Sequence, residues 1–181
     1  MKYLKTYNES IRHFLKPKSK EEISKKLDEL NEYDKLLVAC EYGMFNIIKK
    51  SESYIKELPN NDNWLLTEAS KYGHIDIVKY LLDIGMHPNP EENFYRTENP
   101  LNAAISNGHF DIVKLLLNHK DIDILMIDDL YRNSIVTCLD YKKYDILKYI
   151  MKEKEDIVKW YLSEDHGVAD DIKQLKNKGL L

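Results

Sequence analysis

The six histidines and two cysteines are the residues of this 181-residue chain that could bind a metal ion or act as nucleophiles. A zinc site needs His or Cys ligands at characteristic short spacings, and these side chains are scattered. His74 and His109 each follow a glycine in two similar segments, so their separation reflects a repeat rather than a ligand set. Cys40 and Cys138 lie in apolar stretches, which predicts reduced, buried thiols. The sequence therefore predicts no metal site.

Carboxylates and glycines show no catalytic arrangement either. A group of acidic residues and one histidine lies near the C-terminal end: Asp165, His166, Asp170 and Asp171. Negative charge is favourable at the start of a helix, and this accounts for the group without a catalytic role. The six glycines are too scattered to form a phosphate-binding loop, and no Ser/His/Asp set can be assigned. We expect a protein that is not an enzyme and that needs no cofactor.

The net charge of −4 argues against a strongly basic nucleic-acid binder. Residues 1–26 nevertheless contain eight Lys or Arg and three Glu. This segment is either the solvated face of a helix or a basic arm that contacts an acidic partner or a phosphate backbone. No signal peptide and no membrane-spanning run of apolar residues are recognisable, so we expect a cytoplasmic protein without membrane contact.

The elements that must position these side chains follow an internal repeat. Residues 69–82 and 104–117 match closely, and weaker copies occupy residues 36–48 and 144–150. Four copies with a period of roughly 33 residues indicate a repeat architecture.

One copy shows why the repeat folds as two helices. Asn99 and Pro100 suit the start of a helix, as the N-cap residue and the first helical residue. Gly108 can adopt the left-handed conformation that ends this helix. A second helix with a wide apolar face follows at residues 110–117. Neither helix can bury its apolar surface alone, so neighbouring copies must stack into a solenoid.

The segment Asn99–Leu117 resembles the ankyrin repeat, whose first helix opens with T-P-L-H-x-A. The resemblance covers about residues 33–155 and is strongest in the two central copies. It departs from the family pattern at Thr67 and Asn102, which replace His. Lys142 replaces Gly in the last copy, which predicts an irregular turn between its two helices. The first copy has Lys50 and Ser51 where apolar residues are expected, so the outer copies are interpreted as degenerate capping repeats.

The resemblance implies an all-α fold, an ankyrin-repeat solenoid of about four helix-turn-helix repeats with helical N- and C-terminal caps. We expect residues 1–32 to form an N-terminal helical cap or docking arm, 33–155 the repeat array, and 156–181 a C-terminal helical cap. Helices are expected at residues 3–15 and 19–30. Either one of these helices covers the open apolar end of the first repeat, or the whole segment is an arm that docks on a partner. A final helix is expected at residues 169–178.

Candidate partner-binding residues come from the repeat register. The residues that precede the inter-helix glycines in the first three copies are Tyr42, Tyr72 and Asn107, and Tyr141 holds the same position in the last copy. Lys71, which directly precedes Tyr72, is a further candidate. Stacking would align these side chains along the concave side, where tyrosine suits an interface. The alternative is that the tyrosines only pack across the turn.

The connector between the two central repeats, residues 86–98, supplies further candidates. In ankyrin proteins such a loop forms a projecting finger. Phe94 and Tyr95 are apolar residues in a polar loop, and with Arg96 they are candidates for contact with a partner. Alternatively, the two aromatic side chains fold back on the neighbouring finger.

The resemblance implies a protein-protein interaction module, an adaptor, decoy or inhibitor, that binds through the concave helix ends and the fingers. We expect a monomer. One alternative is nucleic-acid or anionic-surface binding through the basic N-terminal arm, and another is an enzyme with an unrecognised site. The repeats are similar to those of ankyrin proteins from large DNA viruses, protists and intracellular bacteria. This similarity is consistent with a viral or effector protein that acts in the cytoplasm of a host cell.

Overall fold

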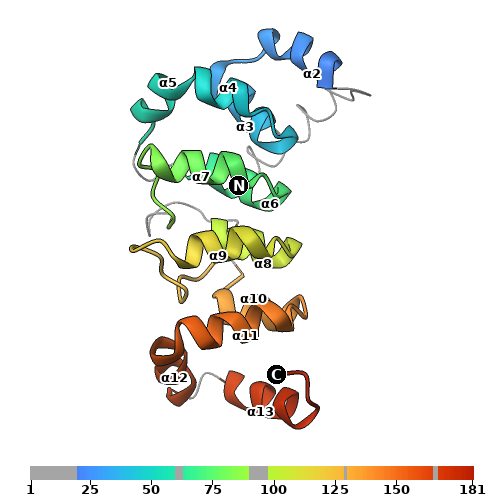
Figure 1. The fold of residues 1–181 in the computed structure, drawn as a ribbon, viewed down its shortest axis with the longest axis vertical. Helices are drawn as coiled ribbons and strands as arrows, with labels where there is room; N and C mark the ends of the chain where they lie inside the picture. Colours follow the sequence, from blue (N-terminus) through green and yellow to red (C-terminus); the bar gives the residue numbers. More distant parts are fainter. Residues whose placement is uncertain (1–19, 60–62, 90–97, 129, 165–166) are drawn as a thin grey trace.

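The structure is a computed structural model that describes residues 20–59, 63–89, 98–128, 130–164 and 167–181. Every regular element within these ranges is a helix, and the helices stack along one long axis (Figure 1). In chain order they are α2 (Lys20–Lys26), η1 (Leu27–Glu29), α3 (Glu32–Tyr42), α4 (Phe45–Lys50), α5 (Glu52–Glu57), α6 (Trp64–Tyr72), α7 (Ile75–Asp83), α8 (Pro100–Asn107), α9 (Phe110–Leu117), α10 (Ser134–Asp140), α11 (Tyr144–Glu153), α12 (Glu155–Ser163) and α13 (Val168–Asn177).

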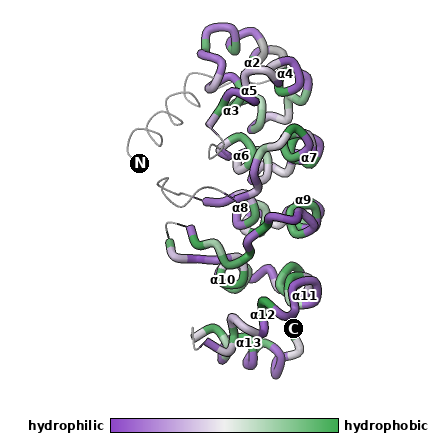
Figure 2. Tube along the Cα trace, turned by 90° about the vertical axis from the view of Figure 1, so that its left-hand side faces the viewer, coloured by the Kyte–Doolittle hydropathy of each residue, from purple (hydrophilic) through white to green (hydrophobic). Residues whose placement is uncertain are grey.

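Four helix pairs form two layers. The first helices, α3, α6, α8 and α10, pack on one another and form what we call the inner layer. The second helices, α4, α7, α9 and α11, form the outer layer. Figure 2 shows the two layers side by side, with the loop between α9 and α10 projecting beyond the inner layer. We call this loop, residues 118–133, the finger loop. The expected all-α solenoid of stacked helix pairs is confirmed.

The helix boundaries follow the capping residues in the sequence. Asn99 is the N-cap of α8, and its side chain accepts a hydrogen bond of 2.8 Å from the Asn102 backbone N–H. Pro100 occupies the first turn, where no backbone donor is needed. Gly108 ends the helix with φ 78°, in the left-handed region. The start and the end of this central helix are as predicted.

The core is one continuous apolar cluster between the two layers. It extends from Leu36 in the first repeat to Ile172 in α13. Cys40 and Cys138 lie within it, and both are free and buried. Burial raises the pKa of the Cys40 thiol well above its ordinary value and raises the pKa of Cys138 to about 12. Both side chains therefore act as small apolar fillers rather than nucleophiles.

The turn between α10 and α11 is regular, so the prediction of an irregular turn at Lys142 is wrong. Lys142 itself adopts the left-handed conformation with φ 54°. The Lys143 backbone N–H donates to the Cys138 carbonyl at 2.8 Å, just as the His109 N–H donates to Ala104 at 2.9 Å. Packing of both helices on the preceding repeat fixes this turn, and the non-glycine residue accepts a backbone cost of about 1–2 kcal/mol.

A histidine joins each central repeat to the one before it. The His74 Nε2–H donates to the Glu41 carbonyl at 3.0 Å, and the His109 Nε2–H donates to the Lys71 carbonyl at 2.9 Å. Each ring lies against the glycine of the preceding turn, so a Cβ on Gly73 would approach His109 Cε1 to 2.6 Å. The glycine therefore provides space for the ring as well as the left-handed turn. The two histidines have a structural role.

Asn102, which replaces the expected histidine, connects α8 to the finger loop. Its side-chain Nδ2 donates to the Arg132 carbonyl at 3.0 Å, and its Oδ1 accepts from the Ser134 hydroxyl at 3.2 Å. Near the start of the same loop, the Asp123 N–H donates to Asn89 Oδ1 at 3.1 Å. These bonds fix the finger loop against the preceding repeat.

Additional helices cover both ends of the array. Ile23 and Leu27 pack with Val38 of α3 in a second apolar cluster. The helix expected at residues 3–15, and most of the basic N-terminal segment, lie outside the described residues.

At the C-terminal end, α12 and α13 both contribute side chains to the main core, and α13 matches the helix expected at residues 169–178. Trp160 on α12 remains 56% exposed. Asp165 and His166, the middle of the acidic group, lie outside the described residues.

Candidate functional site

A groove of about 180 Å³ crosses the inner layer. Helix α6 supplies one wall, the segment before α8 supplies Glu98, and the finger loop with the end of α10 supplies Arg132 and Tyr141. Because α8 packs between α6 and α10, this inner-layer groove spans three consecutive repeats. Its lining residues are Trp64, Thr67, Glu68, Lys71, Glu98, Arg132 and Tyr141.

A buried ion pair fixes Arg132 at the edge of this groove. Arg132 Nε and Nη2 lie 3.0 and 2.8 Å from Asp128 Oδ2. Asp128 Oδ1 also accepts 2.9 Å hydrogen bonds from the backbone N–H groups of Leu130 and Arg132. The Asp128 carboxylate is thus satisfied on both oxygens, and it organises the tip of the finger loop.

Arg132 in turn positions Tyr141. Arg132 Nη1 donates to the Tyr141 hydroxyl at 3.2 Å, and the guanidinium carbon lies 5.4 Å from the ring centroid. The Tyr141 side chain remains 45% exposed. A large aromatic surface is therefore held in one orientation while still facing solvent.

Glu98 is a half-buried carboxylate that lines the same groove as Arg132. Its Oε1 accepts a 2.9 Å hydrogen bond from the Ser106 hydroxyl. Desolvation raises the pKa of Glu98, although the Ser106 bond and the nearby charges of Lys71 and Arg132 oppose the rise. Lys71 itself lies 3.8 Å from Glu68. The groove therefore combines aromatic rings with acidic and basic groups.

The structure brings Lys71 and Tyr141, two of the predicted partner-binding residues, into one groove. Tyr72 is half-buried, with Lys71 Nζ 5.5 Å from its ring centroid. Tyr42 packs against the apolar cluster of the N-terminal cap. Asn107 is exposed, and its side chain donates to the Ala103 carbonyl at 2.9 Å. The predicted row of equivalent side chains thus has four different environments.

The predicted anchors Phe94, Tyr95 and Arg96 lie outside the described residues. Sequence reasoning missed Trp64, Glu98 and Arg132 as groove residues. The spacing of Asp128 and Arg132, opposite charges four residues apart, was a signal for the ion pair that positions Arg132. Glu98 had no comparable signal, because its surroundings come from three separate repeats.

The finger loop displays apolar side chains at its tip. Leu130 is 63% exposed and Tyr131 is 83% exposed. Tyr131 has φ 59°, and its N–H donates to the Asp128 carbonyl at 3.0 Å. Adjacent exposed large apolar residues are typical of contact surfaces.

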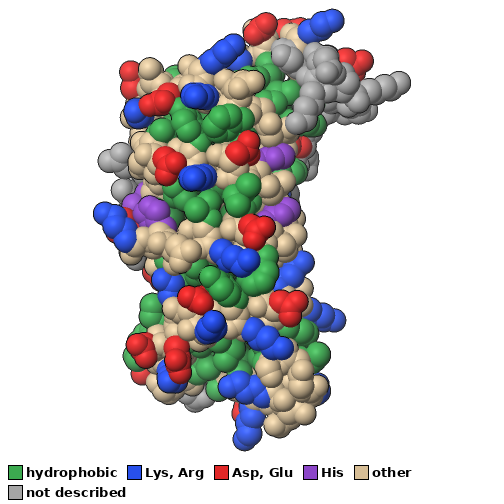
Figure 3. Space-filling model, in the orientation of Figure 1, with side chains coloured by type: hydrophobic (Ala, Val, Ile, Leu, Met, Phe, Trp, Pro, Cys, Tyr) green, Lys and Arg blue, Asp and Glu red, His purple; other side chains and the backbone are tan. Residues whose placement is uncertain are grey.

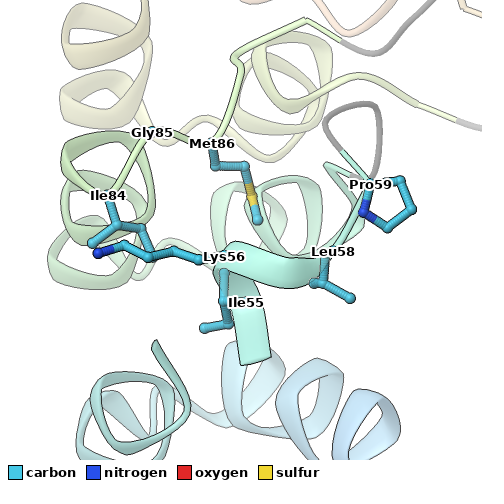
Figure 4. A pocket seen from close by; sticks show the side chains of 7 residues that line it. All are labelled: Ile55, Lys56, Leu58, Pro59, Ile84, Gly85 and Met86. Atoms are coloured by element: carbon cyan, nitrogen blue, oxygen red, sulfur yellow. The ribbon is translucent and has the colours of Figure 1, made fainter. Parts of the chain in front are cut away.

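Other parts of the described chain offer less. A cavity of about 110 Å³ lies between α5 and the turn after α7 (Figure 4). It is lined mainly by apolar side chains and by Lys56, whose Nζ pairs with Glu52 at 2.5 Å. Within the described ranges, no group of three or more His, Cys, Asp or Glu could hold a metal ion. The outer layer shows interspersed acidic and basic side chains rather than a surface of one sign (Figure 3).

The stacked helix pairs, the glycine turns and the projecting loop define a helical-repeat scaffold. A family model for ankyrin repeats, in three copies, matches residues 66–160, more than half of the chain. The chain belongs to the ankyrin repeat family. Across the parts of the chain that are described, no helix is both long and apolar enough to cross a membrane.

One relative is a protein of Acanthamoeba polyphaga mimivirus described as an ankyrin repeat protein. It is 21% identical over 153 residues, and the match covers 78% of this chain and 30% of the relative. The chain thus spans less than a third of that relative's length.

Proposed function

We propose that this chain binds a protein partner across the inner-layer groove and the tip of the finger loop. Ankyrin repeats are generally protein-protein interaction modules. The observation that carries the proposal is the groove itself, which three repeats build from Trp64, Tyr141, Arg132 and the charged side chains between them. Trp, Tyr and Arg are the residue types enriched at the energetic centres of interfaces.

The exposed side chains next to the groove support the same conclusion. The buried Asp128–Arg132 pair holds Arg132 at the groove. Leu130 and Tyr131, which precede Arg132 in the chain, add exposed apolar surface for a partner. Arg132 lines the groove and directly follows Leu130 and Tyr131 in the chain, so one partner can contact both surfaces.

The finer role that we propose is that of an adaptor, decoy or inhibitor that acts as a monomer and has no catalytic activity. The viral relative supports placement in the cytoplasm of a host cell. Size-exclusion chromatography with light scattering tests the monomeric state directly.

Selection of binders from a displayed library of small protein domains tests the proposed surface. We expect the selected domains to lose affinity for the Tyr131→Ala, Tyr141→Ala double variant, because truncation removes two large contact surfaces. A matched control, Lys79→Ala with Lys148→Ala, changes two exposed residues of the outer layer. Thermal denaturation checks that both variants fold. Binders that respond to the outer-layer control and not to the groove variant would contradict the proposal.

A further inference from the structure

We propose that the inner-layer groove receives a basic side chain, lysine or arginine, of the protein partner, and that Glu98 is the carboxylate that pairs with it. This inference rests on the proposed function, because it specifies the chemistry of a partner at the same surface. It concerns a residue that neither the repeat pattern nor the predicted tyrosines indicated.

Glu98 lacks an ion-pair partner among the described residues. Lys71 lies 3.8 Å from Glu68, and Arg132 is held 2.8 Å from Asp128. The described hydrogen bond to the Glu98 carboxylate comes from the Ser106 hydroxyl, a neutral donor. A half-buried carboxylate with one neutral donor retains acceptor sites for a cation.

The charges around Glu98 favour a cationic occupant. Lys71 and Arg132 supply two positive charges, while Glu68, Asp128 and Glu98 supply three negative charges when ionised. The region is therefore one positive charge short of balance, and a single basic side chain would neutralise it. An acidic side chain would be repelled, and an apolar one would leave the Glu98 carboxylate desolvated and unpaired.

The desolvation of Glu98 lowers the cost of pairing. An exposed carboxylate must lose water when it forms a buried ion pair, and this loss offsets most of the attraction. Glu98 has already lost part of its hydration in the free protein, as the raised pKa indicates. Trp64 and Tyr141 line the same groove, and their rings attract a cation through cation–π contact.

Nuclear magnetic resonance can test this with the indole N–H signals of the two tryptophans. Trp64 lines the groove, whereas Trp160 lies on α12 and serves as an internal control. The probes are the blocked tripeptides acetyl-Ala-Arg-Ala-amide and acetyl-Ala-Lys-Ala-amide, with acetyl-Ala-Gln-Ala-amide as the neutral probe. We expect the basic probes to shift the Trp64 signal with saturation at millimolar concentration, while the Trp160 signal stays constant.

The Glu98→Gln variant tests the assigned residue. Glutamine keeps an acceptor for Ser106 but removes the charge, so we expect about tenfold weaker binding of the basic probes, equivalent to about 1.4 kcal/mol. Glu153→Gln, an exposed acid at the end of α11, should bind the probes like the wild type. The stability of Glu98→Gln should equal or exceed that of the wild type at neutral pH, which separates weakened binding from misfolding.

Two results would overturn the inference. One is equal binding of the Gln and Arg probes, and the other is unchanged affinity of Glu98→Gln for the basic probes. If either occurs while selected protein binders still depend on Tyr141, the proposed function stands and only the cation site fails. If those binders map to the outer layer, the proposed function fails as well.

Discussion

The contact between His109 and Gly73 permits a matched test of how adjacent repeats are joined. Gly73 and Gly108 occupy equivalent turns with φ 82° and 78°, so alanine meets nearly the same backbone strain at both. The two sites differ in what an added methyl group would touch. At Gly73 the Cβ would lie 2.6 Å from His109 Cε1, whereas at Gly108 the nearest neighbour would be the flexible Lys143 Nζ at 3.1 Å.

The expected costs follow from these two terms. A non-glycine residue in the left-handed region costs about 1 kcal/mol or more at either turn. At Gly73 the methyl group would also displace the imidazole, which breaks the 2.9 Å hydrogen bond to the Lys71 carbonyl. That loss adds about 1 kcal/mol. We therefore expect Gly73→Ala to destabilise the protein by about 2 kcal/mol and Gly108→Ala by about 1 kcal/mol.

Urea denaturation followed by circular dichroism measures both values. Repeating the two substitutions in a His109→Ala background completes a double-mutant cycle. There, the extra cost of Gly73→Ala should disappear, because no ring remains for the methyl group to displace. Equal costs at both glycines in the wild-type background, or a difference that persists without His109, would refute the inter-repeat role of this histidine.

Three further predictions concern the same turns and the groove. Lys142→Gly should stabilise the protein by about 1 kcal/mol, because glycine adopts the left-handed conformation without strain. The control Lys148→Gly, on the exposed face of α11, should destabilise the protein by about 1 kcal/mol. Urea midpoints that move in the same direction for both variants would contradict this. Gly108→Val should lower the melting temperature more than Gly108→Ala does, because a β-branched residue resists positive φ, and calorimetry of the two variants measures the difference. The raised pKa of Glu98 means that the folded state holds this proton more tightly than the unfolded state, so stability falls as pH rises from about 4.5 through the folded pKa. Glu98→Gln should therefore melt higher than the wild type at pH 7, and the gap should close below about pH 4; a variant that melts lower at pH 7 would count against the desolvation argument.

The repeat fold was predictable because its signals are local. Asn99, Pro100 and Gly108 mark the boundaries of one helix within ten positions, and the closing glycine recurs as Gly43 and Gly73 in two other copies. The turn at Lys142 was mispredicted because the sequence shows the residue type but not the packing that forces its conformation. Stacking against the preceding repeat offsets the conformational cost of a left-handed lysine, a cost that glycine would not have.

The candidate site was only partly predictable. Lys71 and Tyr141 were found because they occupy repeat positions, and repeat register is visible in sequence. Glu98 lies in a connector without periodicity, and the significance of its side chain depends on Ser106, Lys71 and Arg132 from other elements. Desolvation of a carboxylate is a property of the assembled surface, so no local pattern announces it.

The histidine and glycine of each central repeat also bear on how such an array lengthens. One unit of about 33 residues carries both halves of the joint, the imidazole that reaches backward and the glycine that receives the next imidazole. An extra copy of a central repeat could therefore be inserted between two existing repeats without any compensating substitution. Lys142 stands where the receiving glycine would be, so a new copy inserted after α11 would need this position to change before its imidazole could join in the same way.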